Sequence, residues 1–322
     1  MASSAAAGRV LCLYHYPCPD GIFAALAVHL AHKARGVAVD WRPNTVYAPL
    51  SVADLALQGN ETVYLNDFSG GPGFARQVAQ SAQRVVVLDH HKTAAAELTD
   101  PSLARSCPSL EVVFDMERSG ATISYDYFKP QGLTHEQQQL FKYIEDADLW
   151  RWQLPDSKAF SAGLASLQLD FNAQENPAIF DQLLAQTPAS LIARGRPILA
   201  EQQRLVAEAV SQAYTVRLGG AAHAGQDWGR CLAVTVGDEL ARLRSQLGNA
   251  LAQESARRGL RAMGLVAYLE AAMNDSSRIK VSVRSIGEAE DTTPISEAYG
   301  GGGHRNASSF ICGVSEFEAW RE

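Results

Sequence analysis

Four apolar residues, Val85 to Leu88, lead directly into the tripeptide Asp89-His90-His91. A short run that is apolar at every position predicts a strand buried on both faces, as in a parallel sheet flanked by helices. Ligands of such open α/β sheets bind outside the carboxyl ends of the strands. We therefore expect the acid and the two imidazoles at an active-site edge, although polar residues at a strand end also serve simply to cap the next helix.

Two other apolar runs end in the same kinds of side chain. Residues 10–14 run into His15, and residues 62–65 are followed closely by Asp67. In both cases a loop rich in proline or glycine separates the run from a helix-like segment. Asp20 lies at the start of the first of these helices, where an acid is also an ordinary N-cap.

A further pair of acids stands at the end of a helix. The helix-like stretch 140–145 is followed by Asp146 and Asp148. An acid at a helix C-terminus faces the negative end of the helix dipole, so it is a poor structural choice there. A bound cation would reverse that cost.

These segment ends together supply oxygen and imidazole ligands for a metal. The set is His15, Asp20, Asp67, His90 and Asp146. Such donors suit Mn²⁺ or Mg²⁺, with Co²⁺, Fe²⁺ or Zn²⁺ as substitutes. Several carboxylates shared between ions indicate two metals, roughly 3.5–4 Å apart. The alternative is five unrelated polar residues at loop starts, which the repetition of one chemistry at four separate ends disfavours.

The motifs resemble those of the DHH phosphoesterase superfamily, which is named after the tripeptide at 89–91. Residues 9–150 are similar to its catalytic domain. Ser119-Gly120-Ala121-Thr122, and Asp146 with Asp148-Leu149-Trp150, resemble a bacterial branch. The superfamily includes single-strand-specific exonucleases, phosphatases of short oligonucleotides and of phosphoadenosine phosphate, cyclic-dinucleotide phosphodiesterases and manganese pyrophosphatases. The resemblance extends over nearly the whole chain.

The resemblance implies roles for these residues. Asp67 and Asp146 would bridge two metal ions. His15 would bind one of the ions, and Asp20 with His90 would bind the other. The expected catalytic residues lie beside them: His91 on the substrate side and Asp89 behind the pair, where it orients them.

One position departs from the family pattern. The first motif of the family carries two aspartates separated by one residue, and Cys18 stands at the first of these positions. A thiolate is a softer ligand that favours Zn²⁺ or Fe²⁺. The alternative is that Cys18 does not ligate, which leaves one metal weakly held.

Near the C-terminus, four consecutive glycines precede His304 and Arg305. A glycine run lets backbone N–H groups approach an anion closely, Arg is a bidentate phosphate partner, and helix-like sequence follows, as in other phosphate-binding loops. A lone glycine run is usually a flexible turn, but this one resembles the terminal motif of the DHH-associated domain. The resemblance implies a substrate clamp made of Arg284, Ser285, Gly301, Gly302, Gly303, His304 and Arg305.

Length and composition allow two hydrophobic cores, because the chain has 322 residues of which 47% are hydrophobic. We predict an α/β fold with a parallel-sheet catalytic domain at 1–155, a helical connector at 156–213 and a smaller α/β substrate-binding domain at 214–322. The active site is expected in the cleft between the two α/β domains. Pro197 predicts a kink or restart in the connector, and the turn at 273–277 predicts a hairpin.

The charge and the cysteine content limit the classes of partner and the compartment that we expect. The formal net charge is −7, and the basic residues form scattered pairs, whereas a protein that tracks long nucleic acid usually carries a basic stripe. Five widely spaced cysteines indicate a reducing compartment, and no run is long enough for a membrane helix. We expect a cytoplasmic protein that acts on a short substrate, without a membrane or long duplex nucleic acid as partner; a homodimer stays open.

The preferred function is a metal-dependent phosphoesterase. It would hydrolyse short oligonucleotides or small nucleotide phosphoesters, of the nanoRNA or phosphoadenosine phosphate type, by attack of hydroxide bound to two Mn²⁺ ions. The alternatives are a manganese pyrophosphatase or polyphosphatase, and a catalytically weakened nucleotide-binding protein of which Cys18 would be the sign. A nicotinamide-dependent enzyme is disfavoured because no G-x-G-x-x-G opens the first helix.

Overall fold

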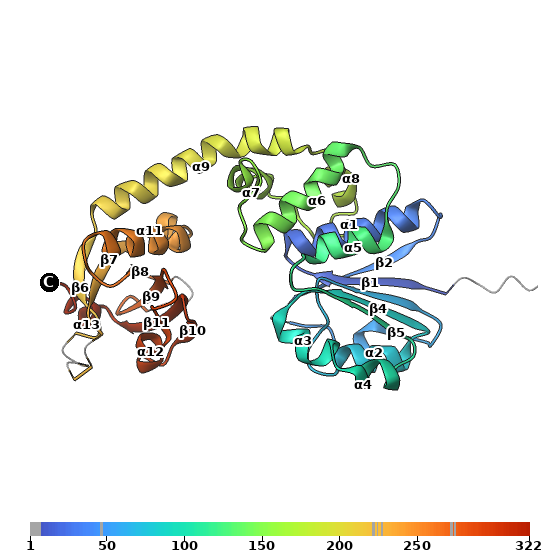
Figure 1. Cartoon of the computed structure of the whole chain (residues 1–322), viewed down its shortest axis with the longest axis horizontal. Coiled ribbons are helices and arrows are strands. Elements are labelled where there is room, and N and C mark those ends of the chain that lie inside the picture. Colours follow the sequence, from blue (N-terminus) through green and yellow to red (C-terminus); the bar gives the residue numbers. More distant parts are fainter. Residues whose placement is uncertain are drawn as a thin grey trace, which may run out of the picture. The chain divides into compact units, whose positions relative to one another are not determined.

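The computed structural model describes residues 8–45, 48–220, 223, 225, 226, 228–270, 273 and 275–322. The start of the predicted catalytic domain, residues 1–7, and Asn274 of the predicted hairpin turn lie outside the described residues. The chain divides into two compact units, Met1–Leu199 and Ala200–Glu322. Each unit is built around its own sheet, as Figure 1 shows.

The first unit contains a five-stranded sheet in which every neighbouring pair is parallel. Its strands are β1 (Val10–His15), β2 (Val39–Asn44), β3 (Thr62–Asn66), β4 (Arg84–Asp89) and β5 (Leu110–Phe114), in the order β2-β1-β3-β4-β5. In an α/β sheet of this order the strand sequence reverses direction between β1 and β3, and the crevice at that switch point is where ligands bind. The order therefore places the ends of β1 and β3 at the preferred ligand position.

The apolar runs form strands because both of their faces are buried. In β4, Val85 and Val87 enter one hydrophobic core while Val86 and Leu88 enter the other, as the alternation of side chains along a strand requires. The helices that cover the two faces are η1 (Ala53–Leu55), α1 (Pro19–Lys33), α2 (Phe74–Ser81), α3 (Lys92–Leu98), α4 (Pro101–Ser106), α5 (Gly120–Phe128) and α6 (His135–Asp148). In Figure 1, α1, α5 and α6 lie on one side of the sheet and α2, α3 and α4 on the other.

The segment that follows α6 completes the core of the first unit. It contains α7 (Ser157–Ala165), α8 (Ile179–Leu184) and the start of α9 (Pro188–Ser211). Phe160 and Ile179 are fully buried in the same core as Phe23 of α1, and full burial of one such side chain contributes roughly 1.5–3 kcal/mol. The first part of the predicted connector thus packs onto the sheet domain of the first unit. Of the kink or restart predicted at Pro197, the restart is wrong, because α9 runs continuously through that residue.

The second unit contains a six-stranded mixed sheet in the order β10-β11-β9-β8-β7-β6. The strands are β6 (Tyr214–Arg217), β7 (Arg230–Val236), β8 (Met263–Tyr268), β9 (Arg278–Ser285), β10 (Gly302–His304) and β11 (Ala307–Gly313). Within this sheet, β7 and β8 are the only described neighbours that pair in parallel, and β8 pairs with β9 antiparallel as the predicted hairpin requires. The helices are α10 (Asp238–Ala241), α11 (Arg244–Arg257), α12 (Thr293–Ala298) and α13 (Val314–Glu318).

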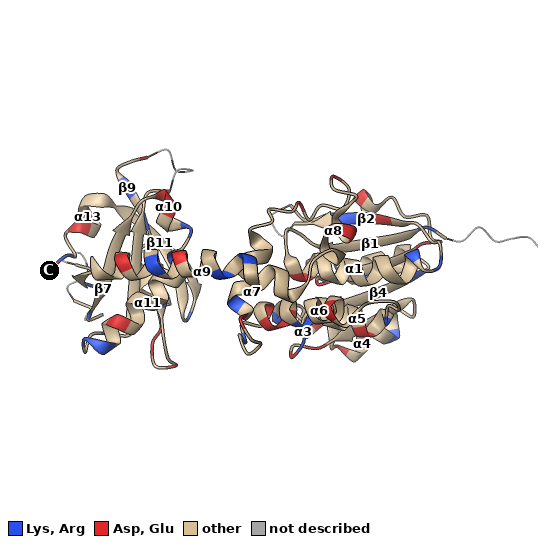
Figure 2. Ribbon diagram, turned by 90° about the horizontal axis from the view of Figure 1, so that it is seen from above, with Lys and Arg blue, Asp and Glu red and all other residues tan. Residues whose placement is uncertain are grey.

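The predicted α/β class, with a parallel sheet in the first part and a second sheet in the last, is confirmed. The prediction of a helix directly after the glycine run is wrong, because residues 307–313 form strand β11. Among the described helices, none combines the length and the apolar character needed to cross a membrane. Figure 2 shows Lys and Arg interleaved with Asp and Glu along the described elements.

Candidate metal centre

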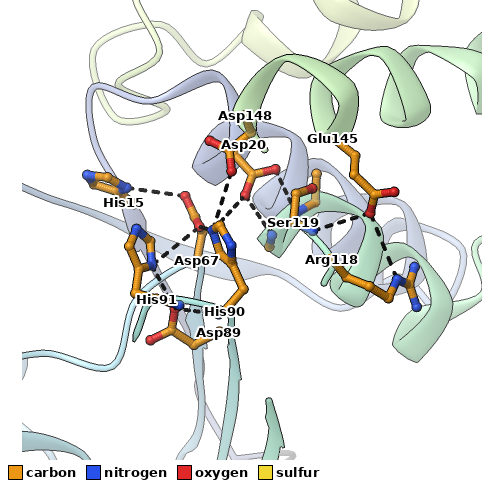
Figure 3. Close-up of polar contacts among 12 residues, drawn as sticks. His15, Asp20, Asp67, Asp89, His90, His91, Arg118, Ser119, Glu145 and Asp148 are labelled. Carbon is orange, nitrogen blue, oxygen red and sulfur yellow. Dashed lines mark hydrogen bonds and ion pairs between the residues drawn. The ribbon is translucent and has the colours of Figure 1, made fainter. Parts of the chain in front are cut away.

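Three strand ends bring their side chains together at the switch point. His15 is the last residue of β1, Asp67 follows β3, and His90 follows β4. His15 Nδ1 lies 3.2 Å from Asp67 Oδ2, and His90 Nε2 lies 3.2 Å from Asp67 Oδ1. Figure 3 shows Asp67 between the two imidazoles. The carboxyl ends of neighbouring parallel strands therefore build the centre of the cluster.

Asp67 is held in a conformation that few residues adopt. Its φ is +60°, in the left-handed region that Asp and Asn tolerate better than most side chains. Gly120 presses against it: a Cβ added at Gly120 would lie 2.6 Å from the Asp67 Cβ. Strained backbone of this kind costs of order 1–3 kcal/mol and clusters at functional sites. The surroundings thus fix the carboxylate in place.

Asp20 reaches the cluster from the first turn of α1. Its carboxylate accepts hydrogen bonds from the N–H groups of Gly120 (2.6 Å) and Ala121 (3.0 Å), at the start of α5. Its Oδ2 lies 3.7 Å from His90 Nε2. Burial, together with the charges of Asp67 and Asp148, raises the pKa of Asp20. The positive end of the α5 dipole offsets part of this destabilisation of the carboxylate.

The charge of Asp67 is stabilised in a different way. Burial alone would raise its pKa, but contacts with His15 and His90 outweigh burial and hold the pKa of Asp67 below its usual range. Two buried carboxylates side by side therefore have pKa values shifted in opposite directions. Such an arrangement accommodates positive charge more easily than it accommodates two bare anions.

Asp148, and not the predicted Asp146, lies in the cluster. Asp148 Oδ2 lies 3.5 Å from His90 Nε2, and Figure 3 shows Asp148 beside Asp20. Asp146 instead accepts hydrogen bonds from the N–H groups of Gln153 (2.9 Å) and Leu154 (3.2 Å), so it stabilises the loop after α6. Side chains two positions apart on a helix point to nearly opposite sides, so only one of the two acids can face His90.

Cys18 lies close enough to contribute a ligand. One ligand atom each from His15, Cys18 and Asp67 lie within 4.8 Å of one another. Cys18 is the N-cap of α1, and burial, followed by the charges of Asp67 and Asp20, raises the pKa of its thiol. The thiol therefore needs a cation nearby to become a thiolate ligand.

Asp89 organises the two histidines of the tripeptide. Its Oδ1 accepts hydrogen bonds from the N–H groups of His90 (2.7 Å) and His91 (3.1 Å), and it lies 2.8 Å from His91 Nδ1. The hydrogen bond to Asp89 raises the pKa of His91 to about 9. The His91 side chain is 40% exposed, whereas that of His90 is 10% exposed. His90 thus points into the cluster and His91 lies at its open side.

The donor set fits divalent cations. Asp67 Oδ1 and His90 Nε2 are buried without a hydrogen-bond partner of good geometry in the described part of the chain. Buried polar atoms without a partner are costly, and a cation would satisfy both. The three groups whose ligand atoms lie within 4.8 Å of one another are His15-Cys18-Asp67, Asp67-His90-His91 and Asp20-His90-Asp148. Carboxylate and imidazole donors with one thiol suit Mn²⁺, Fe²⁺ or Zn²⁺.

The expected clamp residues of the second unit do not gather in the same way. His304, Ala307 and Arg284 lie in one register row across β10, β11 and β9, so His304 and Arg284 share a face of the sheet. Arg284 Nη2 donates to Ser245 Oγ at 2.9 Å. Ser285 points to the opposite face, where its hydroxyl accepts a hydrogen bond from Asn306 Nδ2 at 2.8 Å.

The glycines and Arg305 have structural roles of their own. A Cβ at Gly301 would lie 2.1 Å from the Ser309 carbonyl oxygen, and one at Gly303 would lie 2.4 Å from that of Ala307. Both glycines therefore allow the close approach of β11, while Gly302 has open space around it. The Arg305 guanidinium donates to the backbone carbonyls of Glu288 and Glu290.

Sequence reasoning missed the residues that support Asp20. Glu145 accepts hydrogen bonds from the Ser119 N–H (3.2 Å) and the Thr122 hydroxyl, and it pairs with Arg151 at 3.4 Å. These contacts fix the first turn of α5, as Figure 3 shows for Ser119 and Glu145. No local pattern links Glu145 to α5, so only the tertiary structure reveals this network. The sequence did indicate Asp148, because it lies on the same face of α6 as the buried residues Phe141 and Ile144.

Two hollows adjoin the cluster. One, of about 440 Å³, has the loop 68–72 along its wall and reaches His15, Asp67 and His91. The other, of about 360 Å³, lies on the side of Asp20 and Asp148 and is lined mostly by apolar side chains. The cluster thus has space for a ligand on both sides.

The chain is similar to known proteins in sequence and in fold. No known protein-family model matches the chain. The uncharacterized protein R106 of Acanthamoeba polyphaga mimivirus is 26% identical over 320 residues, which cover 95% of this chain and 69% of the viral protein. The structure of the pGpG-specific phosphodiesterase PggH from Vibrio cholerae aligns with a TM-score of 0.52 and 10% identity, covering 96% of this chain and 95% of PggH. The chain therefore shares the fold of PggH.

Proposed function

We propose that this protein is a phosphoester hydrolase that depends on divalent metal ions and acts on short oligonucleotides or small nucleotides. The observation that carries the proposal is the convergence of His15, Asp20, Asp67, His90 and Asp148 at the β1/β3 switch point. Ligands of this fold bind at that position. The fold shared with PggH supports the proposal.

The ligand set divides around Asp67. His15 and Cys18 lie with Asp67 on one side, and His90 and Asp20 lie on the other, where Asp148 joins them. We infer two ions, preferentially Mn²⁺, with Asp67 between them. Divalent ions bound here would activate a water molecule and stabilise negative charge on the phosphoryl oxygens, the two contributions that phosphoester hydrolysis needs most.

His91 and Asp89 have separate tasks in this proposal. Asp89 fixes the His91 ring by accepting from its Nδ1, so that Nε2 remains for the substrate. His91 then binds a phosphoryl oxygen or the leaving oxygen of the ester and holds a proton there. Asp89 touches no substrate and acts as a positioning residue, because its Oδ1 also holds the two backbone N–H groups that set the direction of both histidines.

The charge of the chain supports a small substrate. The net charge is −7, and in the described residues the basic side chains alternate with acids, so that little would attract a long polyanion. We propose a short oligonucleotide or a nucleotide as the substrate and the cytoplasm as its location. Arg284 and His304, which share one face of the second sheet, are proposed to contact the phosphates of that substrate.

The test is an assay of the full chain after treatment with a chelator and addition of Mn²⁺. The substrates are pyrophosphate, phosphoadenosine phosphate, a cyclic dinucleotide and linear dinucleotides, and the products are separated by chromatography. We expect Mn²⁺-dependent turnover of linear dinucleotides or phosphoadenosine phosphate. Turnover of pyrophosphate alone would establish the alternative, a manganese pyrophosphatase. Absence of turnover on all substrates, with nucleotide binding retained, would contradict hydrolysis and indicate a binding protein.

A further inference from the structure

The hollow beside Asp20 and Asp148 is lined mostly by apolar side chains, which metal binding does not explain. It has a volume of about 360 Å³ and lies between the start of α1, the end of α6, α7 and the loop after α7. Ile144, Leu164 and Phe171 contribute apolar walls. The two carboxylates at one side would repel a second phosphate, and the apolar walls would not hydrate one. The hollow is therefore built for a neutral group that lies next to the cluster.

The wall of this hollow is tied to the strand that carries His15. The Tyr14 hydroxyl donates to the Phe171 carbonyl (2.8 Å) and accepts from the Ala173 N–H (2.9 Å). The Tyr16 hydroxyl donates to Asp170 Oδ1 at 3.3 Å. The two residues that flank His15 thus hold the loop 170–173. A wall fixed to the metal-binding strand is pre-organised for its ligand, which lowers the entropic cost of binding.

Two polar side chains of the hollow have hydrogen-bonding capacity to spare. Ser161 and Gln168 both line it, and neither side chain hydrogen-bonds another group in the part of the chain that the structure describes. Gln168 has a φ of +51°, which turns the chain sharply after α7. Apolar walls with a few polar groups that fix orientation are typical of sites for small organic ligands.

We propose that this hollow, lined by Ile144, Leu164 and Phe171 and bordered by Ser161 and Gln168, binds the nucleobase attached next to the phosphoester that is cleaved. The inference rests on the proposed hydrolase function and names the part of the substrate that the site recognises. A nucleobase is neutral and flat, and its edge carries donors and acceptors that Ser161 and Gln168 can satisfy. A phosphate bound at the cluster would leave its own nucleoside within reach of this neighbouring hollow.

The test fills the hollow with a larger side chain at a position where the fold does not depend on the residue. Ala165, the last residue of α7, lines the hollow and is exposed, so Ala165→Phe fills it and Ala165→Ser is the matched control. Both variants and the original protein are assayed on a dinucleotide and on two analogues in which one or the other base is replaced by hydrogen. Stacking and pocket contacts with one base change affinity by roughly tenfold or more.

We expect Ala165→Phe to lower kcat/KM on the dinucleotide about tenfold, while leaving unchanged the already low kcat/KM on the analogue that lacks the recognised base. Ala165→Ser should behave as the original protein on all three substrates. An equal loss on every substrate, or no loss on the dinucleotide, overturns the nucleobase site and leaves the hydrolase function intact.

If the original protein cleaves none of the three substrates, the proposed function fails on its own. The hollow is then tested by equilibrium binding of AMP, which should be about tenfold weaker for Ala165→Phe than for Ala165→Ser. Equal binding of AMP to the two variants overturns the nucleobase site. Circular dichroism and thermal unfolding of both variants confirm that each is folded.

Discussion

At the carboxyl edge of the first sheet, side chains from separate strands converge on Asp67, whereas around β10 and β11 of the second sheet the residues expected to form a site diverge. His15 and His90 both lie 3.2 Å from Asp67. In the second unit Ser285 and Arg284 point to opposite faces, and Arg305 binds the backbone of its own neighbourhood. Parallel strands deliver their carboxyl ends to one edge by geometry, but a glycine run imposes no such convergence.

The sharpest test of the convergent region is Asp67→Asn. Asn tolerates the left-handed conformation that residue 67 adopts, so the fold should survive. The loss of the central carboxylate should lower kcat/KM on the order of 10³-fold, because charge stabilisation in such a site is among the largest contributions to rate. Steady-state kinetics with Mn²⁺ measure the activity, and calorimetry measures Mn²⁺ binding. Retained turnover would show that the cluster is not the active site.

A pair of variants tests which acid at the end of α6 belongs to the cluster. Asp148→Asn should lower kcat/KM about 10²-fold and weaken Mn²⁺ binding, because Asp148 faces His90. Asp146→Asn should leave activity within a small factor but lower the free energy of unfolding by roughly 1–3 kcal/mol, since it weakens the hydrogen bonds to Gln153 and Leu154. Denaturant unfolding and kinetics on both variants separate the two effects. The reverse pattern would restore Asp146 as the ligand.

Gly120→Ala tests whether the position of Asp67 depends on its neighbour. The added methyl group would lie 2.6 Å from the Asp67 Cβ, so Asp67 or α5 must shift. Disturbed support of a metal ligand typically costs about 10–100-fold in metal affinity, and we expect that loss in a Mn²⁺ titration. Gly237→Ala is the control, because a Cβ at Gly237 has open space around it. Equal affinities for the two variants would show that the cluster tolerates displacement.

The smallest expected effects concern the second sheet. Arg284→Ala should raise KM about tenfold if Arg284 binds phosphate, since hydrogen bonds to charged groups contribute roughly 1.5–3 kcal/mol. Arg305→Ala should change KM less than twofold, because its guanidinium is engaged with the carbonyls of Glu288 and Glu290. Kinetics on one dinucleotide compare the two. A larger effect at Arg305 would mean that the region does act as a clamp.

The sequence predicted the parts of the site that follow strands. Apolar runs such as Val85 to Leu88 define both a buried strand and the point where it ends, so the residues after it could be placed at the sheet edge. The choice between Asp146 and Asp148 depended on the rotation of α6 against the core, which a search for acids does not reveal. The contact of Glu145 with Ser119 joins residues 26 positions apart, and no local pattern encodes it. The glycines at 301 and 303 serve strand pairing, which composition alone does not distinguish from anion binding.

The hydrogen bonds between the Asp20 carboxylate and the first turn of α5 have a consequence for the attraction of substrate. The three carboxylates of the cluster, Asp20, Asp67 and Asp148, carry three negative charges when ionised, and two divalent ions bring four positive ones. The partial positive charge at the α5 N-terminus adds to that excess. Ion loading would thus reverse the local electrostatic potential inside an acidic protein. Binding of a phosphoester would then depend on prior binding of metal, because the ion-free cluster would repel its negative charge and the ion-loaded cluster would attract it.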